Sequence, residues 1–175
     1  MRPMYESLHT AIDEVEFFRD LREQDEWQQY TVSKLPIGYE IECAMATGKA
    51  ITAFCEFKRR HVQMDKYPTL ILSLRKYKQL VSYSWCEDGA YLFVRWNDKD
   101  GVHRIPSKAI EYDIEWGGRI DRGDWQDNEP VVHIPISDFG VLPLERERLA
   151  SSGREKLMRL LDRKLPWTVG PRGSR

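Results

Sequence analysis

A glutamate and a lysine two positions apart stand at the end of an apolar stretch and have the side chains best suited to chemistry. Residues 50–58 alternate between two faces, and Glu56 and Lys58 share one face. An unpaired charge at a buried strand end is costly, so these groups need each other, a metal ion or an anionic substrate. Glu42, on the preceding predicted strand, could bring a second carboxylate to the same edge. The same pattern also fits a solvated strand face with a weak ion pair.

The N-terminal half of the sequence predicts a helix and three strands around these residues. From Leu8 to Glu23, apolar residues recur at intervals of three and four, which is typical of a helix with one buried face. A turn is predicted at Thr47-Gly48-Lys49, and Glu40 and Glu42 fall on one face of the strand before it. The three predicted strands span residues 30–35, 39–46 and 50–58.

The second half predicts one further helix and several strands. Pro68 favours an extended Tyr67, so residues 60–69 are expected to form a loop. Ser73 is expected to cap a helix that runs to Trp85. Further strands are predicted at 90–96, 102–105 and 131–136, the last at a sheet edge because of Pro135, and a glycine-bearing loop at 111–122.

This element order predicts an α/β or α+β domain, with one mixed sheet flanked by helices. We expect the domain to span residues 1–142. Residues 143–175 are predicted to be a C-terminal tail, with a helix at 144–165 and disorder beyond Pro166.

Composition limits the class of protein. The chain has 175 residues, of which 41% are hydrophobic and 31% charged, with a net charge of −1. This balance excludes a strongly basic nucleic-acid binder, but fits a nuclease whose acidic site offsets a basic rim. The three cysteines lack zinc spacing and indicate a reducing compartment. With no predicted signal peptide or membrane span, we expect a soluble, cytoplasmic protein.

Two stretches make the chain resemble the PD-(D/E)xK nuclease superfamily, and within it small phage and prophage members. They are Ala-Phe-Cys-Glu-Phe-Lys-Arg-Arg at 53–60 and Asp-Lys-Tyr-Pro-Thr at 65–69, the latter followed by a predicted helix. Segments 116–119 and 129–135 extend the similarity, which covers residues 8–140. The resemblance implies a restriction-endonuclease-like fold.

The resemblance also implies a divalent-metal site. Glu42, with Glu40 as the second choice, matches the acid before the Glu-x-Lys strand, where the family usually has Asp. Glu56 matches the second metal ligand, and the Phe57 backbone carbonyl a third. Such oxygen ligands suit Mg²⁺, and Mn²⁺ could replace it.

Catalytic and nucleic-acid contacts follow from the same resemblance. Lys58 matches the lysine that positions or activates the attacking water, and Glu16 the acid of the first helix, with Glu14 as the alternative. Gln79 and Tyr83 fit the Gln-x-x-x-Tyr pattern of RecB-like members, one helical turn apart. The residues expected to contact nucleic acid are Arg59, Arg60, Lys66, Tyr67, Lys76, Gln79 and Tyr83.

The resemblance thus implies a Mg²⁺-dependent nuclease that hydrolyses DNA in phage replication, recombination or genome processing. RNA stays open as a substrate, and a homodimer would help a small nuclease cut both strands. One alternative is a nuclease-fold protein that binds nucleic acid or a protein partner without cutting. Another is an ordinary α/β scaffold in which Glu56 and Lys58 merely pair.

Overall fold

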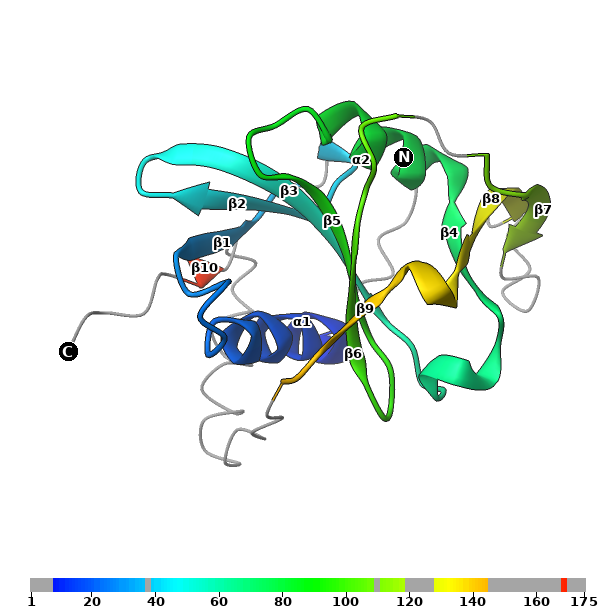
Figure 1. The fold of residues 1–175 in the computed structure, drawn as a ribbon, viewed down its shortest axis with the longest axis horizontal. Helices are drawn as coiled ribbons and strands as arrows, with labels where there is room; N and C mark the ends of the chain where they lie inside the picture. The colour runs from blue at the N-terminus through cyan, green and yellow to red at the C-terminus, as the bar shows by residue number, and fades with distance from the viewer. Residues whose placement is uncertain (1–7, 37–38, 109–110, 119–127, 145–167, 170–175) are drawn as a thin grey trace.

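The part of the chain that the structure describes forms two β-sheets and two α-helices (Figure 1). The computed structural model describes residues 8–36, 39–108, 111–118, 128–144 and 168–169. In chain order the elements are α1 (Leu8–Leu21), β1 (Tyr30–Lys34), β2 (Cys43–Thr47), β3 (Ala50–Arg59), the 3-10 helix η2 (Met64–Lys66), β4 (Thr69–Ser73), α2 (Leu74–Tyr83), β5 (Gly89–Arg95), β6 (Asp100–Arg104), β7 (Ile114–Gly118), β8 (Asn128–Pro135), the 3-10 helix η5 (Ile136–Asp138), β9 (Gly140–Leu142) and β10 (Thr168–Val169).

The larger sheet is mixed, as the sequence predicts. Its seven strands have the order β10-β1-β2-β3-β5-β6-β9. The central β3 runs parallel to β5, and every other neighbouring pair is antiparallel. Parallel neighbours need a long crossover connection, and here it contains η2, β4 and α2. The crossover carries α2 back onto the sheet beside β3.

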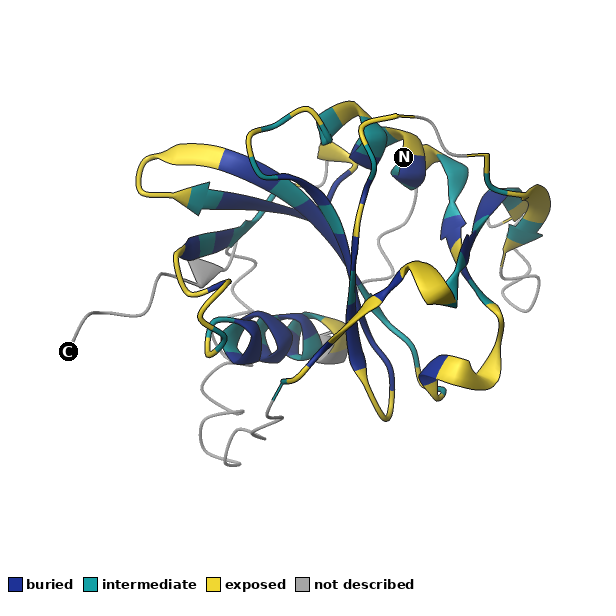
Figure 2. Cartoon of the chain, in the orientation of Figure 1, coloured by how far each residue is buried: buried dark blue, intermediate teal, exposed yellow. Residues whose placement is uncertain are grey.

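Two apolar cores cover the two faces of this sheet. Phe17 and Phe18 of α1 pack on one face against Phe57 and other residues of the central strands. Tyr77 and Leu80 of α2 pack on the opposite face, together with residues of β4, β5 and β8. Figure 1 shows the two helices on opposite sides of the sheet, and Figure 2 shows its central strands buried between them.

The alternation predicted for β3 is confirmed from Ala53 onward. Ala53, Cys55 and Phe57 belong to the core under α1. Glu56 and Lys58 lie on the other face. Glu56 contacts both Lys58 and Lys76 of α2 there. The strand therefore directs its chemical residues to one face while its apolar residues fill the other.

The predicted strand 39–46 is wrong at its start. β2 begins only at Cys43, and Glu40 lies in the preceding turn with a φ of +58°. The left-handed region is uncommon for a residue other than glycine and is typical of a turn. The Glu40 carboxylate pairs with Arg75 on α2, so Glu40 and Glu42 do not share one strand face.

The structure has a second, smaller sheet, whereas the sequence predicted a single mixed sheet. The smaller sheet has the order β4-β8-β7. Strand β7 occupies a segment that we predicted as a loop, and β4 lies between the predicted loop 60–69 and the predicted helix, where no strand was expected. Strand β8 was expected at an edge because of Pro135, but it is the middle strand. The proline is tolerated because it is the last residue of β8, opposite Thr69.

The C-terminal prediction can be compared only in part. Residues 145–167, which hold nearly all of the predicted tail helix, lie outside the described residues. Disorder was expected beyond Pro166, but Thr168–Val169 pair with β1 as strand β10. Within the described part of the chain, no helix is long and apolar enough to cross a membrane.

A buried ion cluster ties α1 to the far part of the larger sheet. Arg95, with 9% of its side chain exposed, donates from Nη2 to Asp20 Oδ2 at 2.8 Å. Its Nε donates to Asp100 Oδ1, also at 2.8 Å. The guanidinium group also lies 5.1 Å from the Phe17 ring centroid. A buried cation in such a position is stable only while its carboxylate partners are present.

We therefore expect Arg95→Met to lower the free energy of unfolding by roughly 3–5 kcal/mol, because it removes the buried cation that lies between two buried carboxylates, Asp20 and Asp100. Urea unfolding followed by circular dichroism measures this change. The matched control is Arg75→Met, since Arg75 is 64% exposed and exposed ion pairs contribute about 0–1 kcal/mol. Equal losses in the two variants would contradict the expectation.

Candidate active site

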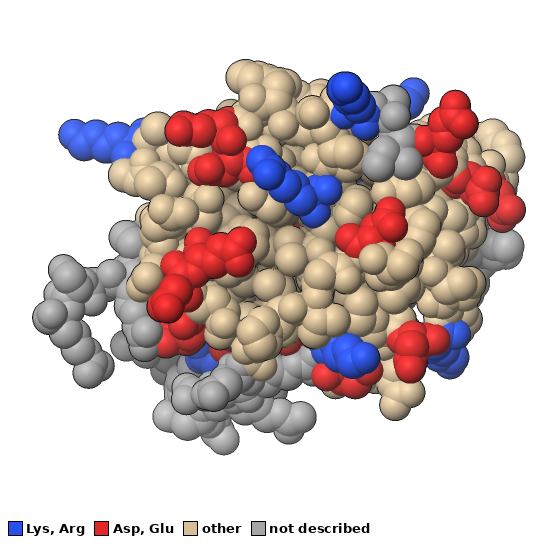
Figure 3. All heavy atoms as spheres, viewed as in Figure 1, with Lys and Arg blue, Asp and Glu red and all other residues tan. Residues whose placement is uncertain are grey.

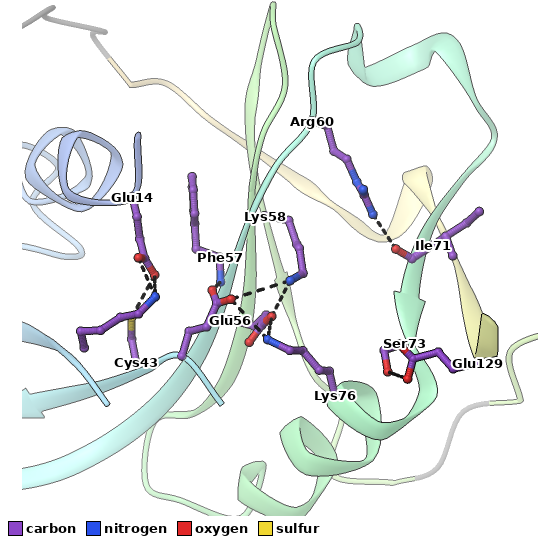
Figure 4. Close-up of polar contacts among 12 residues, drawn as sticks. Glu14, Cys43, Glu56, Phe57, Lys58, Arg60, Ile71, Ser73, Lys76 and Glu129 are labelled. Atoms are coloured by element: carbon purple, nitrogen blue, oxygen red, sulfur yellow. Dashed lines mark hydrogen bonds and ion pairs between the residues drawn. The ribbon is translucent and has the colours of Figure 1, made fainter. Parts of the chain in front are cut away.

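Three charged side chains meet on the α2 face of β3. Lys58 Nζ lies 2.6 Å from Glu56 Oε1. Lys76 Nζ, from the first turn of α2, donates to the same oxygen. Figure 4 shows both lysines pointing at Glu56, one from β3 and one from α2. Glu56 is completely buried, and its Oε2 has no hydrogen-bond partner among the described residues.

Glu42 brings the second carboxylate to this point. Its Oε1 lies 3.3 Å from Lys76 Nζ and 3.8 Å from Lys58 Nζ. Its Oε2 accepts a hydrogen bond of 3.1 Å from the Phe57 N–H. This bond is available because the β2–β3 ladder ends at Cys43 and Cys55, so Phe57 lies beyond it. The chain thus fixes Glu42 by a backbone contact from the strand that carries Glu56.

The two carboxylates titrate in opposite directions. Burial alone raises the pKa of Glu42, but Lys58 and Lys76 outweigh it and, with Lys34, lower that pKa to about 2. Burial raises the pKa of Glu56, and the Glu42 charge raises it further, against the lowering by the two lysines. Two acids that share one set of cations cannot both be equally stabilised as anions.

A third acid reaches the cluster from α1. Glu14 is 1% exposed, and its two oxygens accept from Lys34 Nζ at 2.7 and 3.0 Å. The Glu14 carboxylate also accepts a weak bond from Cys43 Sγ at 3.5 Å, next in sequence to Glu42 (Figure 4). Burial lowers the pKa of Lys34, but Glu42 and then Glu14 more than offset this, so the pKa is raised. Lys34 therefore links Glu14 electrostatically to Glu42.

The two acids considered on the first helix occupy different places. Glu16 is also buried, at 8% exposure. Glu14 pairs with Lys34 and accepts from Cys43, next in sequence to Glu42. These contacts link Glu14, the alternative of the sequence analysis, to the cluster.

The residues fit a divalent cation. Among the described residues no group of three or more His, Cys, Asp or Glu lies close enough to hold a metal, so the protein would supply two carboxylates, Glu42 and Glu56. The unpartnered, buried Glu56 Oε2 is an oxygen that a cation would satisfy. The Phe57 carbonyl points to the same edge as its N–H, which is the Glu42 side. Mg²⁺ accepts few protein oxygens and keeps several waters.

The predicted nucleic-acid residues lie in three places: at the end of β3, around η2 and on α2. Arg59 and Arg60 donate to backbone carbonyls, Arg59 to Arg95 at 2.9 Å and Arg60 to Ile71 at 2.7 Å. These bonds tie the end of β3 to β5 and the segment after it to β4 of the smaller sheet. Lys66 and Tyr67 are exposed beside each other, with the Lys66 ammonium 5.5 Å from the ring centroid.

The α2 residues of this prediction have different surroundings. Tyr83 stacks on Phe54 with ring centroids 4.0 Å apart, so it serves packing. Gln79 is half-buried on the same helix. Lys76, expected to contact phosphate, lies instead on Glu42 and Glu56. On the face drawn in Figure 3, acidic and basic side chains are interspersed and form no continuous basic surface.

Sequence reasoning missed Lys34 and assigned Lys76 to another role. The signal for Lys34 was the β1–β2 register, in which Lys34 pairs with Cys43 directly after Glu42. Lys76 lies in the first turn of α2, and its contacts with Glu42 and Glu56 depend on how this helix packs against β3. Neither follows from local sequence spacing.

The low pKa of Glu42 predicts a pH-dependent contribution to stability. A carboxyl whose pKa falls from 4.5 unfolded to about 2 folded stabilises the fold above pH 4.5, and this stabilisation disappears as the pH falls toward 2. In EDTA at pH 7, we expect Glu42→Gln to lower the free energy of unfolding by roughly 2–3 kcal/mol. The difference from wild type should narrow below about pH 4.5.

Urea unfolding between pH 7 and pH 3 measures this gap. The control is Glu87→Gln, because Glu87 is exposed and surface substitutions usually change stability by less than about 0.5 kcal/mol. A gap between wild type and Glu42→Gln that stays constant with pH would contradict the assignment.

Comparisons with known proteins give a family and a structural similarity. A family model described as "Phage putative PDDEXK endonuclease" matches residues 1–142. Among solved structures, the chain is similar to Hjc, a Holliday junction resolvase from the archaeal hyperthermophile Archaeoglobus fulgidus. That similarity has 16% sequence identity and a TM-score of 0.40, and covers 68% of this chain and 88% of that chain. No match was found among curated proteins.

Proposed function

Because the chain belongs to the family of phage PDDEXK endonucleases, we propose that it hydrolyses phosphodiester bonds of DNA with a divalent metal, Mg²⁺ or Mn²⁺. Glu42 and Glu56 would hold the metal with the Phe57 carbonyl, and Lys58 would act on the attacking water. The metal, the DNA substrate and the roles of these residues go beyond family membership and are the content of the proposal.

One observation carries this proposal. Glu42 and Glu56 come from different segments, yet both have Oε1 within 3.8 Å of the same Lys58 ammonium. An ordinary solvated Glu-x-Lys pair would not have a completely buried glutamate with an oxygen lacking a described partner. Burying these charges costs free energy, and such buried charge clusters are typical of functional sites, here one for a cation and an anionic substrate.

The side chains divide the work of hydrolysis. When bound, the metal would lower the pKa of a water, polarise the phosphate and stabilise the leaving oxygen. Lys58 Nζ lies 2.6 Å from Glu56 Oε1, and 25% of the Lys58 side chain is exposed, so this group is available to orient the attacking water and offset charge on the phosphorane. The Phe57 N–H holds Glu42 in register with Glu56. Exposed Lys66 would meet the nucleic-acid backbone, with salt-dependent affinity and little base readout.

The test is cleavage of end-labelled linear DNA and closed-circular DNA by wild type and by Glu56→Gln, with Mg²⁺, Mn²⁺ or EDTA. Wild type should cut with either metal. EDTA and Glu56→Gln should each abolish cutting, because a neutral amide replaces an anionic ligand. Exposed Glu87→Gln is the matched control and should cut normally. Cutting of the closed circle would identify endonuclease action.

The substrate range needs single- and double-stranded DNA and RNA in the same assay. Cleavage of RNA alone would overturn the DNA assignment and retain the metal site. Absence of cleavage by folded wild type on all four substrates would overturn enzymatic activity of the isolated chain. Binding without cleavage would then be the better account.

A further inference from the structure

The cation that bridges the two acids in this structure is a lysine of α2. Lys76 donates to Glu56 Oε1 and lies 3.3 Å from Glu42 Oε1. Lys58 contacts Glu56 at 2.6 Å but is 3.8 Å from Glu42. Lys76 is therefore at the meeting point of the two carboxylates, the place that a shared metal ligand set would need.

The charges at this point are balanced without a metal. Two carboxylates, Glu42 and Glu56, face two ammonium groups, Lys58 and Lys76. Adding a divalent cation to all four would leave two excess positive charges in a largely buried cluster, which is strongly unfavourable. One ammonium group has to withdraw when a metal enters.

Of the two lysines, Lys76 is the one able to withdraw. Lys58 is on the central strand β3, two residues from Glu56 and on the same face. Lys76 extends from the first turn of α2, and 31% of its side chain is exposed. Its long side chain can therefore move toward solvent without a change in the sheet.

We propose that Lys76 is a positioning residue that occupies the metal site of the metal-free protein and is exchanged for the metal. It holds Glu42 and Glu56 together, prevents their mutual repulsion, and lowers metal affinity because it must be displaced. This inference rests on the proposed metal-dependent function and adds a competitor built into the chain.

Direct metal binding tests the exchange without reference to cleavage. Mn²⁺ is titrated calorimetrically into full-length wild type, Lys76→Met, Lys76→Arg and Lys78→Met at one pH. Lys76→Met should bind Mn²⁺ at least about tenfold more tightly, because no internal cation has to be displaced. Lys76→Arg keeps the charge, and exposed Lys78 is on the same helix; both variants should stay within about threefold of wild type.

Thermal melting supplies a second readout. In EDTA, Lys76→Met should melt below wild type, because the acid pair has lost a cation, and Mn²⁺ should close or reverse this difference. Lys76→Gln, which keeps a hydrogen-bond donor, replaces Lys76→Met if that variant does not fold. Mn²⁺ affinity equal to or weaker than wild type in the uncharged variants overturns the exchange and leaves the proposed nuclease intact. No Mn²⁺ binding by any variant, wild type included, overturns both.

Discussion

Lys58→Ala is expected to lower the metal-dependent cleavage rate by about 10²–10⁴-fold, the usual effect of a group that transfers or positions a proton. The ammonium group is 2.6 Å from Glu56 and partly exposed, so it faces both the acid pair and the solvent. Lys76 still contacts Glu56 in this variant, so the fold should persist. Metal binding should persist as well.

Single-turnover cleavage with Mg²⁺, beside calorimetric Mn²⁺ binding, measures the two properties separately. Lys78→Ala is the matched control, because Lys78 is exposed on α2. A wild-type cleavage rate in Lys58→Ala would remove Lys58 from the reaction. Loss of Mn²⁺ binding together with loss of cleavage would indicate that Lys58 maintains the site instead of acting on the water.

Glu14→Gln is expected to reduce cleavage and metal affinity by about 10–100-fold, as is typical when a residue supporting metal ligands is lost. Glu14 holds Lys34 at 2.7 Å. Without the Glu14 anion, the Lys34 ammonium would interact more strongly with Glu42, whose charge already raises the pKa of Lys34. A third ammonium group would then compete for the acid pair.

Cleavage rates and Mn²⁺ titrations of Glu14→Gln and Glu16→Gln discriminate the two helix acids. Glu16→Gln should stay within about threefold of wild type, since it leaves the Glu14–Lys34 ion pair in place. Glu14→Gln combined with Lys34→Met should recover part of the loss, because the competing cation is removed with its partner. A large loss in Glu16→Gln alone would reverse the assignment.

Much of the architecture could be predicted because it depends on local periodicity. Helix α1 was predicted from its apolar stripe and strand β3 from its alternation. Both elements, and strands β5 and β6, form close to their expected bounds. The predicted superfamily is confirmed by the match over residues 1–142. Glu56 and Lys58 could be named because strand alternation fixes their face on β3, and Glu42 could be named from the resemblance to the superfamily.

The smaller sheet was not predictable in the same way. Strand β7 contains two glycines and pairs only with β8, so its strand character comes from a partner distant in sequence. Strand β4 follows Pro68 directly and looks like the end of a loop. Strand propensity is weak in such segments, and pairing decides the outcome.

Within the site, the positions of the acidic side chains could not be predicted, because they depend on a turn conformation and on how α1 packs against the sheet. Glu40 and Glu42 have strand spacing, yet the left-handed Glu40 turns its carboxylate to Arg75. Glu14 and Glu16 are both buried on α1, and only the position of the helix against β1 and β2 distinguishes them. Such distinctions come from tertiary packing, which no local spacing contains.

The parallel pairing of β3 with β5 has a consequence for how the protein is made. All the proposed site residues lie between Glu14 and Lys76, but the core on which α2 packs includes β5, which comes later in the chain and pairs with β3. The antiparallel strands β1–β2–β3 make local contacts that form fast, whereas a parallel crossover closes late. We therefore expect the acids to be assembled early in folding and Lys76 to arrive last. A nascent chain would gain its complete charge cluster only after β5 has been synthesised.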